Sequence, residues 1–132
     1  MYQLHIEPKV SETDALGHIN NTVMPVWFEA ARTPLFRIFN PELDFDNWHM
    51  VVVGLALDYR RQTYYGRPAE VRGWVASIGK SSIKLAEHLY QDGELCVVNE
   101  AVYVNFDHET QRSRPISDAQ REALQQHLKE DS

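Results

Sequence analysis

An apolar stretch in the first third of the chain, residues 22–39 (TVMPVWFEAARTPLFRIF), constrains the fold more than any other segment. Its apolar side chains recur at near-helical spacing, which predicts a helix. They leave little polar surface on any side: Trp27, Phe28, Ala30, Ala31, Leu35, Phe36, Ile38 and Phe39. A helix that is apolar on nearly every side must be buried, so we expect a sheet to curl around it.

Two prolines define the shape of this helix. Pro25 is tolerated only in the first helical turn, so we expect the helix to begin between Asn21 and Met24. Pro34 should kink the helix between Ala30 and Thr33. The alternative is a second short helix that begins at Pro34 and is capped by Thr33.

The segments on either side of the helix have the patterns of strands. Residues 2–10 alternate apolar and polar side chains, and Pro8 places this strand at a sheet edge or ends it early. Four later strands joined by short turns are expected at residues 50–65, 69–78, 81–90 and 95–107. The order of one strand, a buried helix and four strands predicts an α+β domain with an antiparallel sheet.

The last segment predicts a second, polar helix. Ser117 is a favourable N-cap residue, and Gln120 three residues later would complete a capping box. Residues 118–131 continue the helix, with Leu124 and Leu128 as its only apolar seam.

Composition bounds the classes of function. The 132 residues suit one domain, which we take as residues 1–132. With 13 Lys and Arg against 19 Asp and Glu, the net charge of −6 argues against a nucleic-acid partner. Cys96 is the only cysteine, which excludes an intrachain disulfide and a multi-cysteine metal site. The histidines outside residues 13–21 lack metal-ligand spacing, so we expect no metal.

Targeting signals are not evident. No apolar run approaches the roughly 20 residues of a membrane span. The N-terminal residues lack the apolar region of a secretory signal. We therefore expect a cytoplasmic protein with no membrane partner.

Two motifs carry a family resemblance: TDALGHINN at residues 13–21 and VWFEAAR at residues 26–32. Together they resemble the signature of the 4-hydroxybenzoyl-CoA thioesterase-like group of hotdog proteins. The likeness extends loosely over residues 4–107. It implies the hotdog fold, in which a five-stranded antiparallel sheet wraps around a long central helix, here followed by a C-terminal helix. It also implies hydrolysis of an acyl-CoA thioester to free acid and CoA.

This chain differs from the family pattern at two places. Many relatives have tyrosines where this chain has Thr22 and Pro25, and many have an acidic residue at the position of Ala69. These differences concern the choice of substrate more than the fold.

The resemblance implies that Asp14 is the catalytic base or the nucleophile, and the sequence leaves both roles open. Asp14 precedes a helix whose first N–H groups have no intrahelical partner, and such groups can stabilise an oxyanion. The family places that donor at the backbone of Asn21 or a near neighbour. Gly17 would let the loop approach the thioester closely. A structural role for Asp14 as a turn residue is the alternative.

Three further polar residues accompany Asp14. His18 could orient a group in the site or could tie the loop together through backbone hydrogen bonds. Asn20 and Asn21 suit turn and capping roles. For Glu29 we favour an ion pair with Arg32 three residues later, and the alternative is that Glu29 holds the Asp14 loop or positions water.

Coenzyme A, as part of the substrate and not as a cofactor, would require local cations on an acidic protein. The candidates lie around one strand end and one turn: Arg60, Arg61, Arg67, Lys80 and Lys84, with Ser81 and Ser82 for the pantetheine amides. The alternative is a solvated strand rim.

A five-stranded curled sheet leaves an exposed edge, and the resemblance implies a homodimer or homotetramer with sites at the interface. Two other functions remain open. One is a non-catalytic acyl-CoA-binding module, and the other is an acyl-carrier-protein thioesterase. A hydratase of the same fold is disfavoured because its characteristic His-Phe-Pro type of motif is absent.

Overall fold

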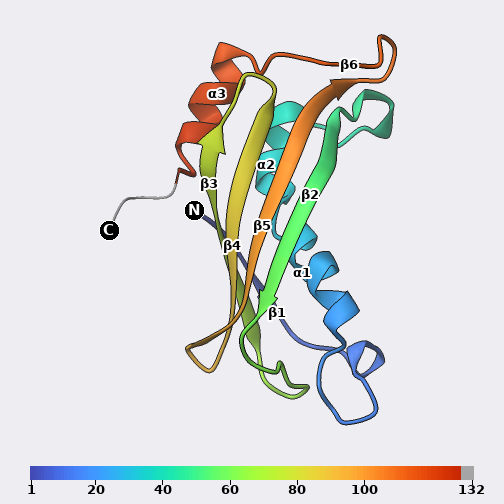
Figure 1. Cartoon of the computed structure of the whole chain (residues 1–132), viewed down its shortest axis with the longest axis vertical. Helices are drawn as coiled ribbons and strands as arrows, with labels where there is room; N and C mark the ends of the chain where they lie inside the picture. The colour runs from blue at the N-terminus through green and yellow to red at the C-terminus, as the bar shows by residue number, and fades with distance from the viewer. Residues whose placement is uncertain (129–132) are drawn as a thin grey trace.

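The computed structural model describes residues 1–128 and contains one antiparallel sheet with two short helices against one face (Figure 1). The elements in chain order are β1 (Tyr2–Ile6), α1 (Met24–Ala30), α2 (Thr33–Phe39), β2 (Met50–Tyr59), β3 (Ala69–Ile78), β4 (Ser82–Gln91), β5 (Glu94–Asp107), β6 (Arg112–Ser113) and α3 (Asp118–Gln125). No helix among residues 1–128 is long and apolar enough to cross a bilayer.

The sheet has the strand order β1-β3-β4-β5-β2, so β1 and β2 form its two edges. All neighbouring strands are antiparallel, as the sequence predicted. The five-stranded prediction omitted β6, a two-residue strand that pairs with the end of β5. The predicted strand 50–65 is too long, because β2 ends at Tyr59.

The expected long central helix is two short helices. α1 and α2 have seven residues each, and the chain breaks between them at Ala31 and Arg32. The cause is Pro34, which lies in the first turn of α2, where its missing N–H costs no hydrogen bond. Pro25 occupies the equivalent position in α1, as predicted. Thr33 does not cap α2, since Arg32 precedes the helix.

A buried ionic cluster lies at the break between α1 and α2. The Arg32 guanidinium donates to both carboxylate oxygens of Glu87 on β4, at 2.9 and 2.7 Å, and to the Tyr103 hydroxyl at 2.9 Å. The Tyr2 hydroxyl and the Asn99 amide also donate to Glu87, at 2.7 and 2.8 Å. Burial is the largest single influence and lowers the pKa of Arg32, but the hydrogen bonds and charge of Glu87, together with Tyr103, outweigh it and raise the arginine pKa above its ordinary value. This cluster fixes the helix break to the centre of the sheet.

Strand β1 packs against a glycine of the neighbouring strand β3. The Tyr2 ring lies directly over Gly73 of β3, and any Cβ at that position would collide with the ring. The ring position delivers the Tyr2 hydroxyl to the buried Glu87. Gly73 is therefore required by packing between two strands.

The predicted C-terminal helix is present but shorter than expected. Ser117 and Gln120 form the predicted capping box at its start. The helix ends at Gln125, and residues 129–131 of the prediction lie outside the described residues. Just beyond the helix, the carbonyl of His127 accepts the N–H of Val75 at 2.8 Å, where β3 has a bulge. The end of the chain thus satisfies a donor that the sheet leaves unpaired.

Candidate active site

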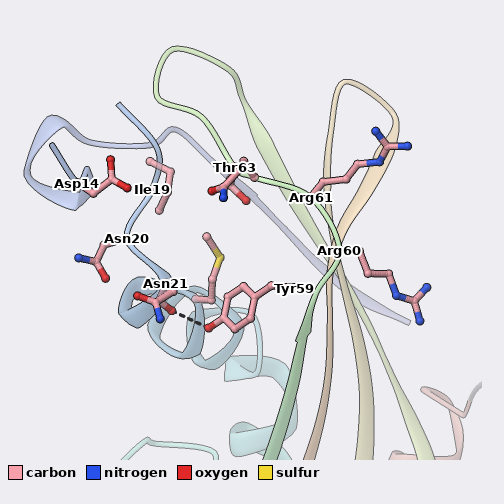
Figure 2. A pocket seen from close by; sticks show the side chains of 10 residues that line it. Asp14, Ile19, Asn20, Asn21, Tyr59, Arg60, Arg61 and Thr63 are labelled. Carbon is pink, nitrogen blue, oxygen red and sulfur yellow. Dashed lines mark hydrogen bonds between the residues drawn. The ribbon is translucent and has the colours of Figure 1, made fainter. Parts of the chain in front are cut away.

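A cavity of about 480 Å³ lies between the loop after β1, the start of α1 and the end of β2 (Figure 2). Its walls contain two of the predicted catalytic residues, Asp14 and Asn21, and two of the predicted CoA-binding residues, Arg60 and Arg61. The remaining walls are formed by Ile19, Asn20, Met24, Tyr59, Gln62 and Thr63. Asp14 and residues 19–21 of the motif therefore line one cavity, whereas Gly17 and His18 do not line it.

The Asp14 carboxylate closes the tight turn in which it lies. One oxygen, Oδ1, accepts the N–H groups of Leu16 at 2.8 Å and His18 at 3.1 Å. Gly17 has φ +81°, a backbone conformation that favours glycine. The other oxygen, Oδ2, lies 3.8 Å from the His18 ring and accepts no hydrogen bond from residues 1–128. One Asp14 oxygen is thus used by the turn, and the other can serve a ligand.

A second segment braces this loop from outside. Ile19 donates its N–H to the Thr63 carbonyl at 2.7 Å, and Tyr65 donates to the Gly17 carbonyl at 3.3 Å. The buried Gln91 side chain holds the same segment, accepting from the Tyr64 N–H at 2.8 Å and donating to the Tyr64 carbonyl at 2.9 Å. No local pattern in the sequence predicts these braces, because the partners are far apart along the chain.

The 3-10 turn Asn21–Val23, which leads into α1, leaves one amide group without an acceptor among residues 1–128. Asn20 accepts the Thr22 N–H through its side chain at 2.9 Å and the Val23 N–H through its carbonyl at 3.0 Å, in agreement with its predicted capping role. The Asn21 N–H has no acceptor among residues 1–128. A trans peptide holds its C=O and N–H antiparallel. Because the Asn20 carbonyl points along the helix toward Val23, the Asn21 N–H points away from the helix end.

The Asn21 carbonyl also has a fixed partner, which the sequence did not identify. The Tyr59 hydroxyl, at the end of β2, donates to it at 2.7 Å (Figure 2). Partial burial raises the pKa of the Tyr59 phenol, so it is a neutral donor near pH 7. Tyr59 thus ties the sheet edge to the beginning of α1.

His18 and Glu29 lie in different surroundings. The His18 ring packs edge-on against Tyr64 at 5.2 Å, beside the Asp14 carboxylate. Glu29 is exposed on α1 and does not line the cavity. The expected ion pair between Glu29 and Arg32 does not form, because Arg32 binds Glu87 instead.

The predicted CoA-binding residues fall at two ends of the sheet. Arg60 and Arg61 line the cavity, and in Figure 2 their guanidinium groups extend away from Asp14. Arg60 pairs with Asp58 at 3.1 Å and Arg61 with Glu94 at 3.2 Å.

The turn that contains Lys80, Ser81 and Ser82 lies at the opposite end of the sheet, where β2 begins (Figure 1). A single chain therefore does not bring the two sets together. In the described part of the chain, no group of three His, Cys, Asp or Glu side chains could hold a metal ion.

The sequence and the fold are similar to those of known proteins. The family model described as "Thioesterase-like superfamily" matches residues 8–124. A structure described as a predicted thioesterase from Bacillus stearothermophilus is 42% identical, with a TM-score of 0.96 and coverage of 99% of this chain and 98% of that chain.

Two further relatives are more distant. A thioesterase from Thermus thermophilus, solved with coenzyme A and Zn, is 26% identical with a TM-score of 0.85, and the match covers 95% of this chain and 92% of that one. A Bacillus subtilis (strain 168) protein provisionally named an acyl-CoA thioesterase is 25% identical over 109 residues, which is 80% of this chain and 79% of the relative.

Proposed function

The chain belongs to the thioesterase-like superfamily, and we propose that it hydrolyses an acyl-CoA thioester to a free acid and CoA, with Asp14 at the chemical centre. One observation carries the proposal. Asp14 keeps one carboxylate oxygen free of backbone hydrogen bonds, and it lines the same cavity as Asn21, whose N–H has no acceptor among residues 1–128. A thioesterase needs both a base or nucleophile and a donor for the developing oxyanion.

In the general-base form of the reaction, Asp14 takes a proton from a water molecule as that water attacks the carbonyl carbon. The C=O electron pair moves onto oxygen, and the Asn21 N–H stabilises the resulting oxyanion. The C–S bond then breaks, and the CoA sulfur leaves and takes up the proton. A donor of this kind accounts for about 3–4 kcal/mol in the transition state.

In the nucleophilic form, an Asp14 oxygen attacks the carbonyl carbon, the C–S bond breaks, and CoA leaves as the thiolate. Water then opens the resulting mixed anhydride and supplies the proton that the thiolate takes up. A single turnover in H₂¹⁸O tests for the nucleophilic form through label in Asp14. Direct attack by water labels the released acid. If water opens the anhydride at its Asp14 carbonyl, the label appears in the Asp14 carboxylate instead.

Arg60 and Arg61 are the cations that we assign to the CoA phosphates. Both are more than half exposed, and ion pairs at such positions contribute only about 0–1 kcal/mol. A phosphate can therefore compete with Asp58 and Glu94 for them. The coenzyme A bound to the Thermus thermophilus relative supports a CoA ligand.

We propose that the functional unit is a homodimer formed through β2, which could associate further into a tetramer. This edge strand exposes large apolar side chains, among them Val53 at 60% and Leu55 at 46%. Exposed edges pair with other strands, and apolar ones do so most readily. Antiparallel pairing of two β2 strands about a two-fold axis would put the start of one beside the end of the other. Lys80, Ser81 and Ser82 of one copy would then approach the Arg60–Arg61 side of its partner.

The experiment that tests the function is thiol release from short, long and aromatic acyl-CoAs. We expect the native chain to cleave at least one and Asp14→Asn to lose most of that activity. Asp118→Asn, an exposed change in α3, is the matched control and should remain active. Activity that survives Asp14→Asn would contradict the assignment of Asp14.

Two other results would name other functions. Acyl-CoA binding without cleavage would indicate a binding module in which Asp14 only closes its turn. Cleavage of acyl-carrier-protein thioesters in preference to CoA thioesters would indicate that the exposed arginines meet an acidic protein surface.

A further inference from the structure

We propose that Tyr59 is a positioning residue that fixes the Asn21 amide as the oxyanion donor. This inference rests on the proposed thioesterase function. It begins from the 2.7 Å hydrogen bond between the Tyr59 hydroxyl and the Asn21 carbonyl, which joins two residues 38 positions apart.

Two hydrogen bonds hold the peptide between Asn21 and Thr22, one at each edge of its plane. Tyr59 donates to the carbonyl, and the Asn20 side chain accepts the Thr22 N–H at 2.9 Å. The preceding peptide is held at its carbonyl by Val23. Asn21 therefore lies between two fixed peptide planes, and its own N–H is the group left without an acceptor in residues 1–128.

An oxyanion donor acts through its fixed orientation, because it then needs no reorganisation during the reaction. The residues around Asn21 form only a short 3-10 turn, which by itself holds the backbone weakly. A strand is a more rigid support than such a turn. Tyr59 thus transfers the rigidity of β2 to the amide.

The chain offers a matched pair of variants. Tyr59→Phe removes only the hydroxyl, and Tyr65→Phe makes the same change at a tyrosine of similar exposure, 50% against 47%. The Tyr65 hydroxyl has no hydrogen bond within residues 1–128, and its backbone bond to Gly17 is unaffected. Kinetics are measured on the acyl-CoA that the native chain cleaves best.

We expect Tyr59→Phe to lower kcat on the order of 10-fold, since small misplacements of catalytic groups are costly. KM should stay within about twofold because ground-state contacts are kept. Tyr65→Phe should leave both values unchanged. The pH profile of kcat should keep its shape at a lower plateau, because Tyr59 exchanges no proton with the substrate.

Three results would overturn the proposal: native kcat in Tyr59→Phe, equal losses in both variants, or a lost limb of the pH profile. The last would make Tyr59 a proton donor. An NMR comparison of backbone amides gives a readout without substrate. Tyr59→Phe should shift the Asn21 and Thr22 amide signals, and Tyr65→Phe should not. If the native chain cleaves no thioester, the proposed function is wrong. If the native chain is active and Tyr59→Phe keeps its kcat, only the role of Tyr59 is wrong.

Discussion

Removing the buried Arg32 side chain should destabilise the protein severely. Arg32→Met deletes three hydrogen bonds and leaves Glu87, which has no exposed surface, with only the Tyr2 and Asn99 donors. Breaking a buried ion pair costs about 3–5 kcal/mol. Because two neutral donors remain, we expect about 4 kcal/mol.

This loss translates into a large change in melting temperature. At about 2.1 cal/mol/K per residue, a chain of 132 residues unfolds with an entropy near 0.28 kcal/mol/K. A loss of about 4 kcal/mol then lowers Tm by about 14 °C. Circular dichroism can follow the transition, at one fixed protein concentration because association also shifts Tm.

The matched control is Lys84→Met, on the same strand as Glu87. Lys84 forms an exposed pair with Glu100 at 3.3 Å, so its loss should cost less than about 1 kcal/mol. The double variant Arg32→Met with Glu87→Met should be more stable than Arg32→Met alone, since it leaves no unpaired buried charge. The recovery should be partial, because the Tyr2 and Asn99 donors lose their acceptor. If Arg32→Met lowers Tm no further than Lys84→Met, the reasoning about the buried pair is refuted.

Other changes test individual features of the fold. Gly73→Ala should lower the free energy of unfolding, measured in urea, by roughly 1–3 kcal/mol because the new Cβ would collide with the Tyr2 ring. Gly54→Ala should lower it clearly less, since the nearest atom to a Cβ at that position is 3.8 Å away. Burial lowers the pKa of His127 from its ordinary 6.5, so the folded state resists protonation of this side chain and the protein loses stability as the pH falls below 6.5. The Tm of His127→Gln should therefore vary less between pH 5 and 8 than the Tm of the native chain. Ser117→Ala should lower the free energy of unfolding by about 1 kcal/mol, and an unchanged midpoint would contradict the capping role.

Local features of the fold were predictable because their causes lie within a few residues. Pro34 predicts the helix break because proline has no N–H to donate and its ring clashes with the backbone of a preceding helical turn. The capping by Asn20 follows from a side chain that acts on its own neighbours. The left-handed backbone at Gly17 is possible because glycine has no Cβ. Of the residues that line the cavity, Asp14 and Asn21 belong to the motif at residues 13–21, which can be recognised because its residues lie next to one another in the chain.

Long-range partners were not predictable from such patterns. Arg32 has a carboxylate three residues earlier, yet it binds Glu87, 55 residues away, because the helix break turns Arg32 toward the sheet. A buried guanidinium needs a buried partner, whereas Glu29 can remain in water. Tyr59 was missed for a similar reason, since its hydroxyl acts on a backbone carbonyl that no side-chain motif marks.

The separation of the predicted CoA-binding residues shows a different limit. Arg60 and Lys80 are only 20 positions apart, but β3 runs the length of the sheet between them. Sequence distance therefore understated their separation. Only the strand order, with β2 at an open edge, gives a way for a second copy to bring them together.

The contact between His127 and the β3 bulge bears on where this domain can be cut. The family match ends at residue 124, within α3, so a boundary placed there would remove the carbonyl that receives the Val75 N–H. It would also truncate the helix beside Leu124, which is fully buried. An expression fragment trimmed to the family match would expose a sheet donor and part of the core. A working fragment of this chain must extend at least through His127.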